Sequence, residues 1–151
     1  MLKHLVLLAF FGSFLVLQPA TGFARATKEQ AVEFVKKAVA YHEKNGTEKS
    51  LAEFSNPKGE FVKDDLYLTV WDFKGTQIAH GANAKLIGKN LIDLKDADGK
   101  EFVKEFMKVA DKGSGWVEYK WTNATNKKIE NKATYLQKSK DILIGAGIYS
   151  E

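Results

Sequence analysis

The stretch Asp65-Leu66-Tyr67-Leu68-Thr69-Val70-Trp71-Asp72-Phe73-Lys74-Gly75-Thr76-Gln77-Ile78-Ala79-His80 decides the fold, because it predicts two β-strands joined by a tight turn. Its first half is rich in aromatic and β-branched residues, which favour strands. Lys74-Gly75 interrupts the run, and Gly75 can adopt the positive φ that short hairpin loops need. We therefore expect a β-hairpin over residues 65–80.

The two faces of the first strand in this hairpin differ in character, because successive side chains of a strand point in opposite directions. The aliphatic face, which suits a hydrophobic core, carries Leu66, Leu68 and Val70. The opposite face, whose side chains combine rings with polar atoms, carries Tyr67, Thr69 and Trp71. The second strand ends at His80. This second face can therefore line a polar cavity.

The composition is that of one folded domain. The chain has 151 residues, enough to bury a hydrophobic core, and aromatic residues make up 12% of it. It contains no cysteine, which excludes disulfides, thiolate metal sites and c-type haem attachment. Its lysines are scattered among acidic residues, whereas a nucleic-acid-binding protein would cluster them, so we expect no nucleic-acid partner.

The N-terminus predicts a secretory signal peptide. Lys3 gives a positive start, residues 5–17 are almost wholly apolar, and Ala24-Arg25-Ala26 offers the small residues that a signal peptidase reads. We therefore expect export to remove the N-terminus near Ala24 or Ala26, and we assign residues 1–26 to the signal peptide and residues 27–151 to the mature domain. Loss of Lys3 and Arg25 lowers the net charge from +4 to +2. The apolar run is shorter than the ~20 residues of a spanning helix, and retention as a membrane anchor is the alternative. An exported chain without cysteine fits a bacterial periplasm.

Helices are predicted on both sides of the hairpin in the sequence. Thr27 and Gln30 form a capping box before a helix that ends at Asn45-Gly46, with His42 expected on its solvated side. Its apolar residues, at helical spacing, are Ala31, Phe34, Val35, Ala38 and Tyr41. Thr47 is expected to cap a second, shorter helix. Asp98, with Glu101 in capping-box register, is expected to cap a third helix that is closed by Gly113-Ser114-Gly115. The residues that this helix is expected to bury are Phe102, Val103, Phe106, Val109 and Ala110.

Three more strands are predicted in the second half of the chain, over residues 116–121, 132–137 and 142–149. The glycines of the last strand, Gly145 and Gly147, permit close backbone approach. The order of elements is helices, two strands, a helix and three strands. We therefore expect an α+β fold with an antiparallel sheet of about five strands.

An ordered series of short motifs resembles a known family. The motifs are Asn56-Pro57-Lys58-Gly59-Glu60-Phe61, Asp65-Leu66-Tyr67, Asp72 with Gly75, Ala79-His80, Leu86-Ile87-Gly88-Lys89-Asn90, Asp96-Ala97-Asp98-Gly99-Lys100, residues 113–121, Lys132, Tyr135 and Gly145-Ala146-Gly147-Ile148-Tyr149. Together they resemble the single Cache domain, type 2, the extracytoplasmic sensor module of bacterial chemoreceptors and histidine kinases. The resemblance covers essentially the whole mature chain.

The resemblance implies a PAS-like sheet preceded by a long helix, with a small-molecule pocket between the sheet and its covering loops. Ligands across the family are commonly small organic acids. One departure is Ala124, which follows Asn123 where the family often has a proline. A second is that the chain stops at Glu151, directly after the last predicted strand, so we expect a free-standing Cache protein that works through a partner.

The candidate ligand-binding residues combine donors with aromatic walls. Tyr119 and Trp121 share one face of a strand, while Lys132 and Tyr135 lie in or beside the next strand. Hydroxyl, indole and ammonium donors are the groups that a small anion needs. The complete set of candidates is Tyr67, Trp71, His80, Trp116, Tyr119, Trp121, Lys132 and Tyr135. The alternative is that the rings belong to the core and the lysine is solvated, with His80 capping its strand.

We expect a sensing domain that binds a small carboxylate in the periplasm and acts in signal transduction or chemotaxis through a membrane receptor or kinase. Whether it forms a homodimer stays open. Beyond the signal segment only His42 and His80 supply imidazoles, and no nucleophile-elbow motif is present, so we predict no catalytic residue, metal or cofactor. The alternatives are a periplasmic enzyme, a scavenging solute-binding protein, or a partner-binding module that takes no ligand.

Overall fold

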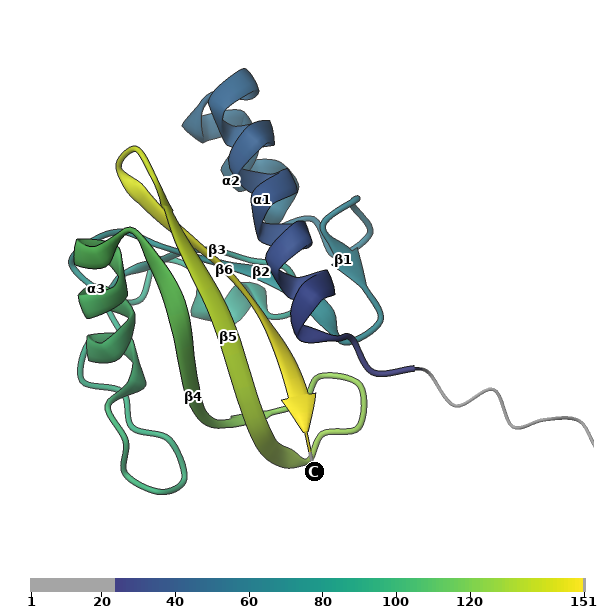
Figure 1. The fold of residues 1–151 in the computed structure, drawn as a ribbon, viewed down its shortest axis with the longest axis vertical. Helices are drawn as coiled ribbons and strands as arrows, with labels where there is room; N and C mark the ends of the chain where they lie inside the picture. Colours follow the sequence, from purple (N-terminus) through teal and green to yellow (C-terminus); the bar gives the residue numbers. More distant parts are fainter. Residues whose placement is uncertain (1–23, 151) are drawn as a thin grey trace, which may run out of the picture.

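The computed structural model describes residues 24–150, which contain three α-helices, a short 3₁₀ helix and a six-stranded antiparallel sheet (Figure 1). The helices are α1 (Lys28–Asn45), α2 (Thr47–Phe54), η1 (Ala84–Leu86) and α3 (Phe102–Lys112). The strands are β1 (Val62–Lys63), β2 (Leu66–Trp71), β3 (Gln77–His80), β4 (Ser114–Thr122), β5 (Ile129–Ser139) and β6 (Ile142–Ser150). The predicted α+β class is confirmed. All of the predicted signal peptide except residues 24–26 lies outside the described residues.

The sheet is built around the predicted hairpin, which is confirmed. Strands β2 and β3 pair antiparallel with Thr69 opposite His80, and Gly75 adopts a φ of 83° in the turn. The strand order is β1-β2-β6-β5-β4, with β3 also paired to β2. The last strand of the chain is therefore interior, between β2 and β5. The two-residue strand β1 brings the sheet to six strands, against the five or so expected.

The two faces of the sheet are covered by different helices. Helix α1 packs against β5 and β6, and α3 packs against β4 and β5, so that the strands lie between the two helices (Figure 1). The aliphatic side chains of β2 lie in a core with α1, whose buried members include Leu66, Leu68, Val70, Val35 and Ala38. The ring-bearing side of β2 faces a second cluster that α3 covers, whose members include Trp71, Phe102, Phe106, Tyr119 and Leu143. The alternation predicted for β2 is confirmed.

Helix α1 begins as the sequence predicts but differs at its C-terminal end. Thr27 Oγ1 accepts from the Gln30 N–H at 3.2 Å, and Gln30 Oε1 accepts from the Thr27 N–H at 2.8 Å, which completes the capping box. The prediction that His42 is solvated is wrong, because its side chain is fully buried. His42 Nδ1 lies 2.7 Å from Ser139 Oγ and Nε2 lies 3.0 Å from Thr47 Oγ1. It thus joins α1 to the start of α2 and to the end of β5.

The start of α3 also differs from the prediction. The helix begins at Phe102 after Glu101, and no side chain caps its N-terminus, so Asp98 is not the cap. The carboxylate of Asp96 instead accepts backbone N–H groups of Asp98, Lys100 and Lys120, at 2.9, 2.8 and 2.9 Å. These hydrogen bonds hold the pKa of Asp96 below its usual value. Asp96 therefore fixes the loop before α3 against strand β4.

Candidate ligand-binding site

Side chains from four strands and the loop before α3 converge on the α3 side of the sheet, and we call the space between them the Lys132 pocket. Its lining consists of Tyr67, Thr69, Trp71, Gln77, His80, Leu91, Leu94, Phe102, Tyr119, Trp121 and Lys132. Alternation along β2 and β4 places Tyr67 with Trp71, and Tyr119 with Trp121, on this face. The free space is only about 10 Å³, counted as positions open to the centre of a water molecule. That is room for about one water.

Lys132 is the charged group of this pocket, and it is 3% exposed. Its Nζ donates to the hydroxyl oxygens of Tyr67 at 2.7 Å and Tyr149 at 3.1 Å. The same nitrogen lies 4.2 Å from the centre of the Tyr67 ring and 4.6 Å from that of Tyr149. No carboxylate within residues 24–150 forms an ion pair with it. Because buried charges in proteins are usually paired, the positive charge of Lys132 is available to an anion.

Gly147 on β6 makes room for the Lys132 side chain. A Cβ atom at this position would collide with Lys132 Cε and Thr134 Oγ1. Position 147 therefore requires glycine because the lysine stem crosses it. A Cβ at Gly145 would likewise come within 2.8 Å of Leu136 Cδ2, so the close neighbours of both glycines are chiefly side chains. The expected close approach of a backbone is limited to the Tyr135 carbonyl oxygen, 3.2 Å from such a Cβ at Gly145.

The tyrosines that bind Lys132 are also hydrogen-bonded to each other. The hydroxyl groups of Tyr67 and Tyr149 lie 2.9 Å apart, and Tyr149 also donates to the carbonyl oxygen of Thr122 at 3.2 Å. Burial raises the pKa of Tyr149, and burial raises that of Tyr119 as well. A tyrosine that stays protonated remains a hydrogen-bond donor and does not neutralise the lysine.

His80 is a neutral donor in the same pocket. Its Nδ1 accepts the backbone N–H groups of Ala82 at 3.1 Å and Asn83 at 2.9 Å. Burial, with a smaller contribution from Lys132, lowers the pKa of His80 to about 3. A neutral imidazole that accepts at Nδ1 carries its proton on Nε2, so the other side of the ring can donate. These backbone hydrogen bonds at the end of β3 match the expectation that His80 caps its strand, and donation from Nε2–H to a bound acid stays a prediction.

Two further polar side chains lie on the pocket wall. Trp71 is 3% exposed, and its Nε1–H has no hydrogen-bond partner in the described part of the chain. A buried donor without a partner carries a desolvation cost of about 1–3 kcal/mol, which a ligand oxygen would remove. Gln77 is also buried and donates through Nε2 to Thr69 Oγ1 at 2.5 Å. The pocket wall thus offers hydrogen-bond donors to an acceptor group of a ligand.

The structure brings six of the eight candidate residues together and leaves two elsewhere. Those that line the pocket are Tyr67, Trp71, His80, Tyr119, Trp121 and Lys132. Trp116 and Tyr135 pack instead against the core on the α1 side, with their ring centres 5.5 Å apart. Each is three residues from a pocket residue in its strand, which places it on the opposite face.

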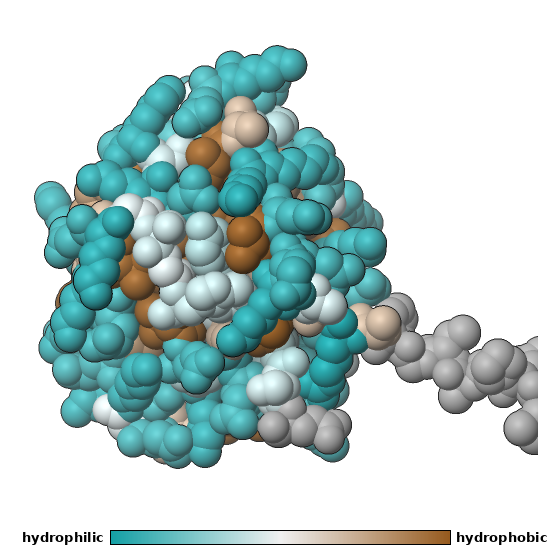
Figure 2. All heavy atoms as spheres, viewed as in Figure 1, coloured by the Kyte–Doolittle hydropathy of each residue, from teal (hydrophilic) through white to brown (hydrophobic). Residues whose placement is uncertain are grey.

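Seen from the direction of Figure 1, pale and brown residues gather over the strands between α1 and α3 amid hydrophilic surroundings (Figure 2).

Sequence reasoning missed Tyr149 and Gln77 as members of the site. Tyr149 could have been found, because alternation along β6 places it on the same face as Gly147. Gln77 lies opposite Trp71 in the register between β2 and β3, and the bulge next to it hides that pairing from the sequence. Within residues 24–150, no group of three or more His, Cys, Asp or Glu side chains could hold a metal ion. No helix in that range is long and apolar enough to cross a membrane.

Comparison with known families gives one family match. Residues 24–151 match the model of the family described as Single Cache domain 2. Among curated proteins, the sensor histidine kinase MctS of Rhizobium johnstonii is 30% identical over 87 residues, which are 56% of this chain. The match covers 19% of the kinase, so the chain corresponds to about a fifth of that relative.

Solved structures agree with this fold. The crystal structure of a methyl-accepting chemotaxis protein from Vibrio parahaemolyticus has a TM-score of 0.70 and 26% identity, covering 81% of this chain and 87% of that one. A second structure, described as showing carboxylic acid recognition by a Cache chemosensory domain, has a TM-score of 0.63 and 23% identity. It covers 82% of this chain and 88% of that one, and at this identity it supports the fold alone.

Proposed function

Because the chain belongs to the Single Cache domain 2 family, we propose that residues 24–150 form a sensing domain that binds a small organic acid in the Lys132 pocket. The chain carries a Cache domain similar to those of chemotaxis receptors and of a sensor histidine kinase. Fold alone does not assign a ligand, so the argument for the acid comes from the side chains of the pocket.

The buried ammonium group of Lys132 carries this proposal. Among the described residues it hydrogen-bonds only to the hydroxyl groups of Tyr67 and Tyr149, and no carboxylate pairs with it. A carboxylate placed beside it would form a charge-assisted hydrogen bond worth about 1.5–3 kcal/mol. The Nε2–H of His80 and the unpartnered Nε1–H of Trp71 supply further donors to the same space. An anion with two acceptor oxygens matches this set of donors.

The rest of the lining sets the size and polarity of the acid. The apolar part of the lining suits a short hydrocarbon tail. It consists of Phe102, Trp121, Leu91 and Leu94. The present free space holds about one water, so an acid of several heavy atoms enters only if the lining moves. Leu91 and Leu94 lie between η1 and α3, outside any helix or strand, and this segment is the part of the wall that can shift without breaking the sheet.

We further propose that the domain acts outside the cytoplasm, in the periplasm, and passes its signal to a membrane receptor or kinase without catalysing a reaction. The similarity to a chemotaxis protein and to a sensor kinase supports this role. Scavenging of the acid by the free protein is the competing function, and assembly as a homodimer is compatible with either role. Crosslinking in cells with and without the acid distinguishes them, because only a sensor gains or loses a partner when the acid is present.

The experiment that tests ligand binding begins with the purified protein. Native mass spectrometry identifies any acid that copurifies, and calorimetric titration with acetate, propionate and pyruvate measures binding directly. We expect saturable binding of at least one short monocarboxylate with a one-to-one ratio. If none of the three binds and no acid copurifies, the carboxylate proposal is wrong. Binding of an uncharged analogue such as propionamide with equal affinity would contradict it as well.

A further inference from the structure

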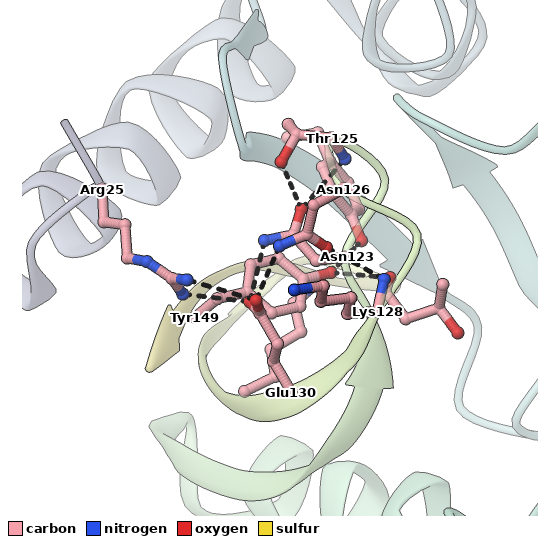
Figure 3. Close-up of polar contacts among 10 residues, drawn as sticks. Arg25, Asn123, Thr125, Asn126, Lys128, Glu130 and Tyr149 are labelled. Carbon is pink, nitrogen blue, oxygen red and sulfur yellow. Dashed lines mark hydrogen bonds and ion pairs between the residues drawn. The ribbon is translucent and has the colours of Figure 1, made fainter. Parts of the chain in front are cut away.

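A second polar cluster lies near the start of α1, where β4 is followed by the loop to β5 (Figure 3). The carboxylate of Glu130 accepts two hydrogen bonds from the Arg25 guanidinium, at 3.0 and 3.1 Å. It also accepts from Asn123 Nδ2 at 2.9 Å and Asn126 Nδ2 at 2.7 Å. The Glu130 side chain is 9% exposed. These donors, Arg25 first, lower the pKa of Glu130 to about 2.

This cluster shows that Arg25 is part of the folded domain. A two-pronged Arg–carboxylate contact is the strongest ion-pair geometry that side chains offer. Arg25 joins the segment before α1 to the first residues of β5, which lie 105 positions later in the chain. A chain that began at Thr27 would lose this contact and would leave the Glu130 carboxylate without its cation.

Asp65 lies beside the same segment and lacks a partner. It is 7% exposed, and its Oδ1 atom accepts no hydrogen bond from any residue in the described range. Asp65 shares a hollow of about 180 Å³ with Ala24, Arg25, Asn123, Thr125 and Asn126. It also shares a wider groove with Ala24 and Arg25 along the start of α1. A buried carboxylate with an unpartnered oxygen is costly, and a cation in this hollow would remove the cost.

We propose that processing cleaves the peptide bond between Ala24 and Arg25 and that the new α-ammonium group of Arg25 pairs with the Asp65 carboxylate. The step is a hydrolysis by a signal-processing peptidase: water adds across the bond, Ala24 leaves as a carboxylate and Arg25 gains the ammonium group. Gly22 and Ala24 place small residues three positions and one position before this cut, as such a peptidase requires. The sequence alone left cleavage near Ala24 or Ala26 open, and this proposal selects Ala24 in place of the boundary after residue 26.

The helix dipole supports the same choice of bond. An α-ammonium group on Thr27 would sit at the N-cap of α1, where the partial positive charge of the helix end repels a cation. An α-ammonium group on Arg25 lies two residues before that end and faces Asp65 across the hollow. Cleavage at Ala24 therefore keeps the Arg25–Glu130 contact and supplies the cation that Asp65 lacks.

The first test measures the cut. The full chain is exported from a bacterial host, and the intact mass of the recovered protein gives its first residue. We expect a chain that begins at Arg25. A chain that begins at Thr27, or one that retains Met1, would overturn the proposal.

The second test measures the ion pair and does not depend on export. Chains that begin at Arg25 are compared with a free and with an acetylated N-terminus. We expect the free amine to raise the midpoint of thermal unfolding by a few degrees, and Asp65→Asn to abolish that difference. Asp64→Asn, in the exposed neighbouring position, should leave the difference intact. If Asp65→Asn does not fold, the test is the pKa of the α-ammonium group in the chain with a free N-terminus, measured by NMR. Pairing with Asp65 raises this pKa above its ordinary value of about 8. Equal midpoints for free and acetylated chains, or an α-ammonium pKa at its ordinary value, would refute the pairing.

Discussion

The ammonium nitrogen of Lys132 lies 2.7 Å from the hydroxyl oxygen of Tyr67, so this buried cation is held by a neutral group. A hydroxyl orients the ammonium group without cancelling its charge. An entering carboxylate therefore does not have to displace a resident carboxylate before it can bind. Burial also raises the pKa of Tyr149, so this second hydroxyl beside the lysine stays protonated and does not cancel its charge.

Replacing Lys132 with methionine should weaken binding of the acid by about ten- to a hundredfold, because the stem stays and the charge is lost. A charge-assisted hydrogen bond is worth about 1.5–3 kcal/mol, and each 1.4 kcal/mol is about tenfold in affinity. Calorimetric titration with the acid found for the wild type measures the change. Lys138→Met removes an exposed lysine from the same strand, and we expect it to bind as the wild type does.

Two observations separate a damaged site from a damaged fold in this experiment. Thermal unfolding without ligand should show that Lys132→Met is folded. Tyr135→Phe alters the opposite face of β5 and should leave affinity unchanged, since Tyr135 does not reach the pocket. Wild-type affinity in Lys132→Met would show that the site is misplaced.

Replacing Gly147 with alanine should weaken binding through Lys132. The added Cβ collides with the lysine stem and with Thr134, so the ammonium group shifts from its place between the tyrosines. Because the effect acts through the lysine, the double variant with Lys132→Met should bind no more weakly than Lys132→Met alone. Gly115→Ala is the matched control, since its Cβ meets only Val109 at ordinary contact distance. Additive losses in the double variant would mean that Gly147 acts independently of the lysine.

His80 should make the domain less stable as the pH falls. Its pKa is lowered to about 3 in the folded chain, against about 6.5 when unfolded, so between these values only the unfolded chain binds the proton. The free energy of unfolding should then drop by up to about 1.4 kcal/mol for each pH unit below 6.5, for this one group. His80→Asn keeps an acceptor for the backbone N–H groups and removes the titration. Denaturant unfolding between pH 4 and pH 8 should give a smaller slope for the variant; equal slopes would show that His80 is protonated in the fold.

His42 should contribute to stability through its two hydroxyl partners. His42→Leu fills the buried space but leaves Ser139 Oγ and Thr47 Oγ1 without the imidazole, which costs about 1–3 kcal/mol. The free energy of unfolding from urea titration measures this loss. Glu43→Ala, at the exposed neighbouring position, should change stability by no more than about 0.5 kcal/mol. A wild-type midpoint for His42→Leu would mean that the buried hydroxyls find other partners.

The alternation of side chains along each strand determined how much of this structure the sequence could predict. Alternation along β2 correctly separated Tyr67 and Trp71 from Leu66 and Leu68. The same rule places Trp116 on the face opposite Tyr119, because an odd number of positions separates them along the strand. Trp116 was nevertheless included among the candidate site residues because it is aromatic.

The remaining differences arise from contacts between distant segments. His42 follows Ala38 by one helical turn on the buried side of α1, so its burial could have been predicted from the sequence. Its hydrogen-bond partner Ser139, however, lies 97 positions away in the chain. The lack of a partner for Trp71 Nε1 and for Asp65 Oδ1 depends on which side chains fold around them. No local pattern contains that information.

The interior position of β6 has a consequence for how the chain folds. Strand β2 pairs along one edge with β6, so that Leu68 lies opposite Ala146, and β5 pairs with the other edge of β6. In a growing polypeptide the edges of β2 and β5 that face β6 therefore stay unpaired until β6 has been synthesised, whereas the β2–β3 hairpin and the β4–β5 pair can form earlier. Pairings between remote segments form slowly, because the intervening loop loses entropy before contacts compensate. Until β6 is made, the part of the sheet that holds β1, β2 and β3 is not joined to the part that holds β4 and β5, so β6 is the strand that unites the sheet.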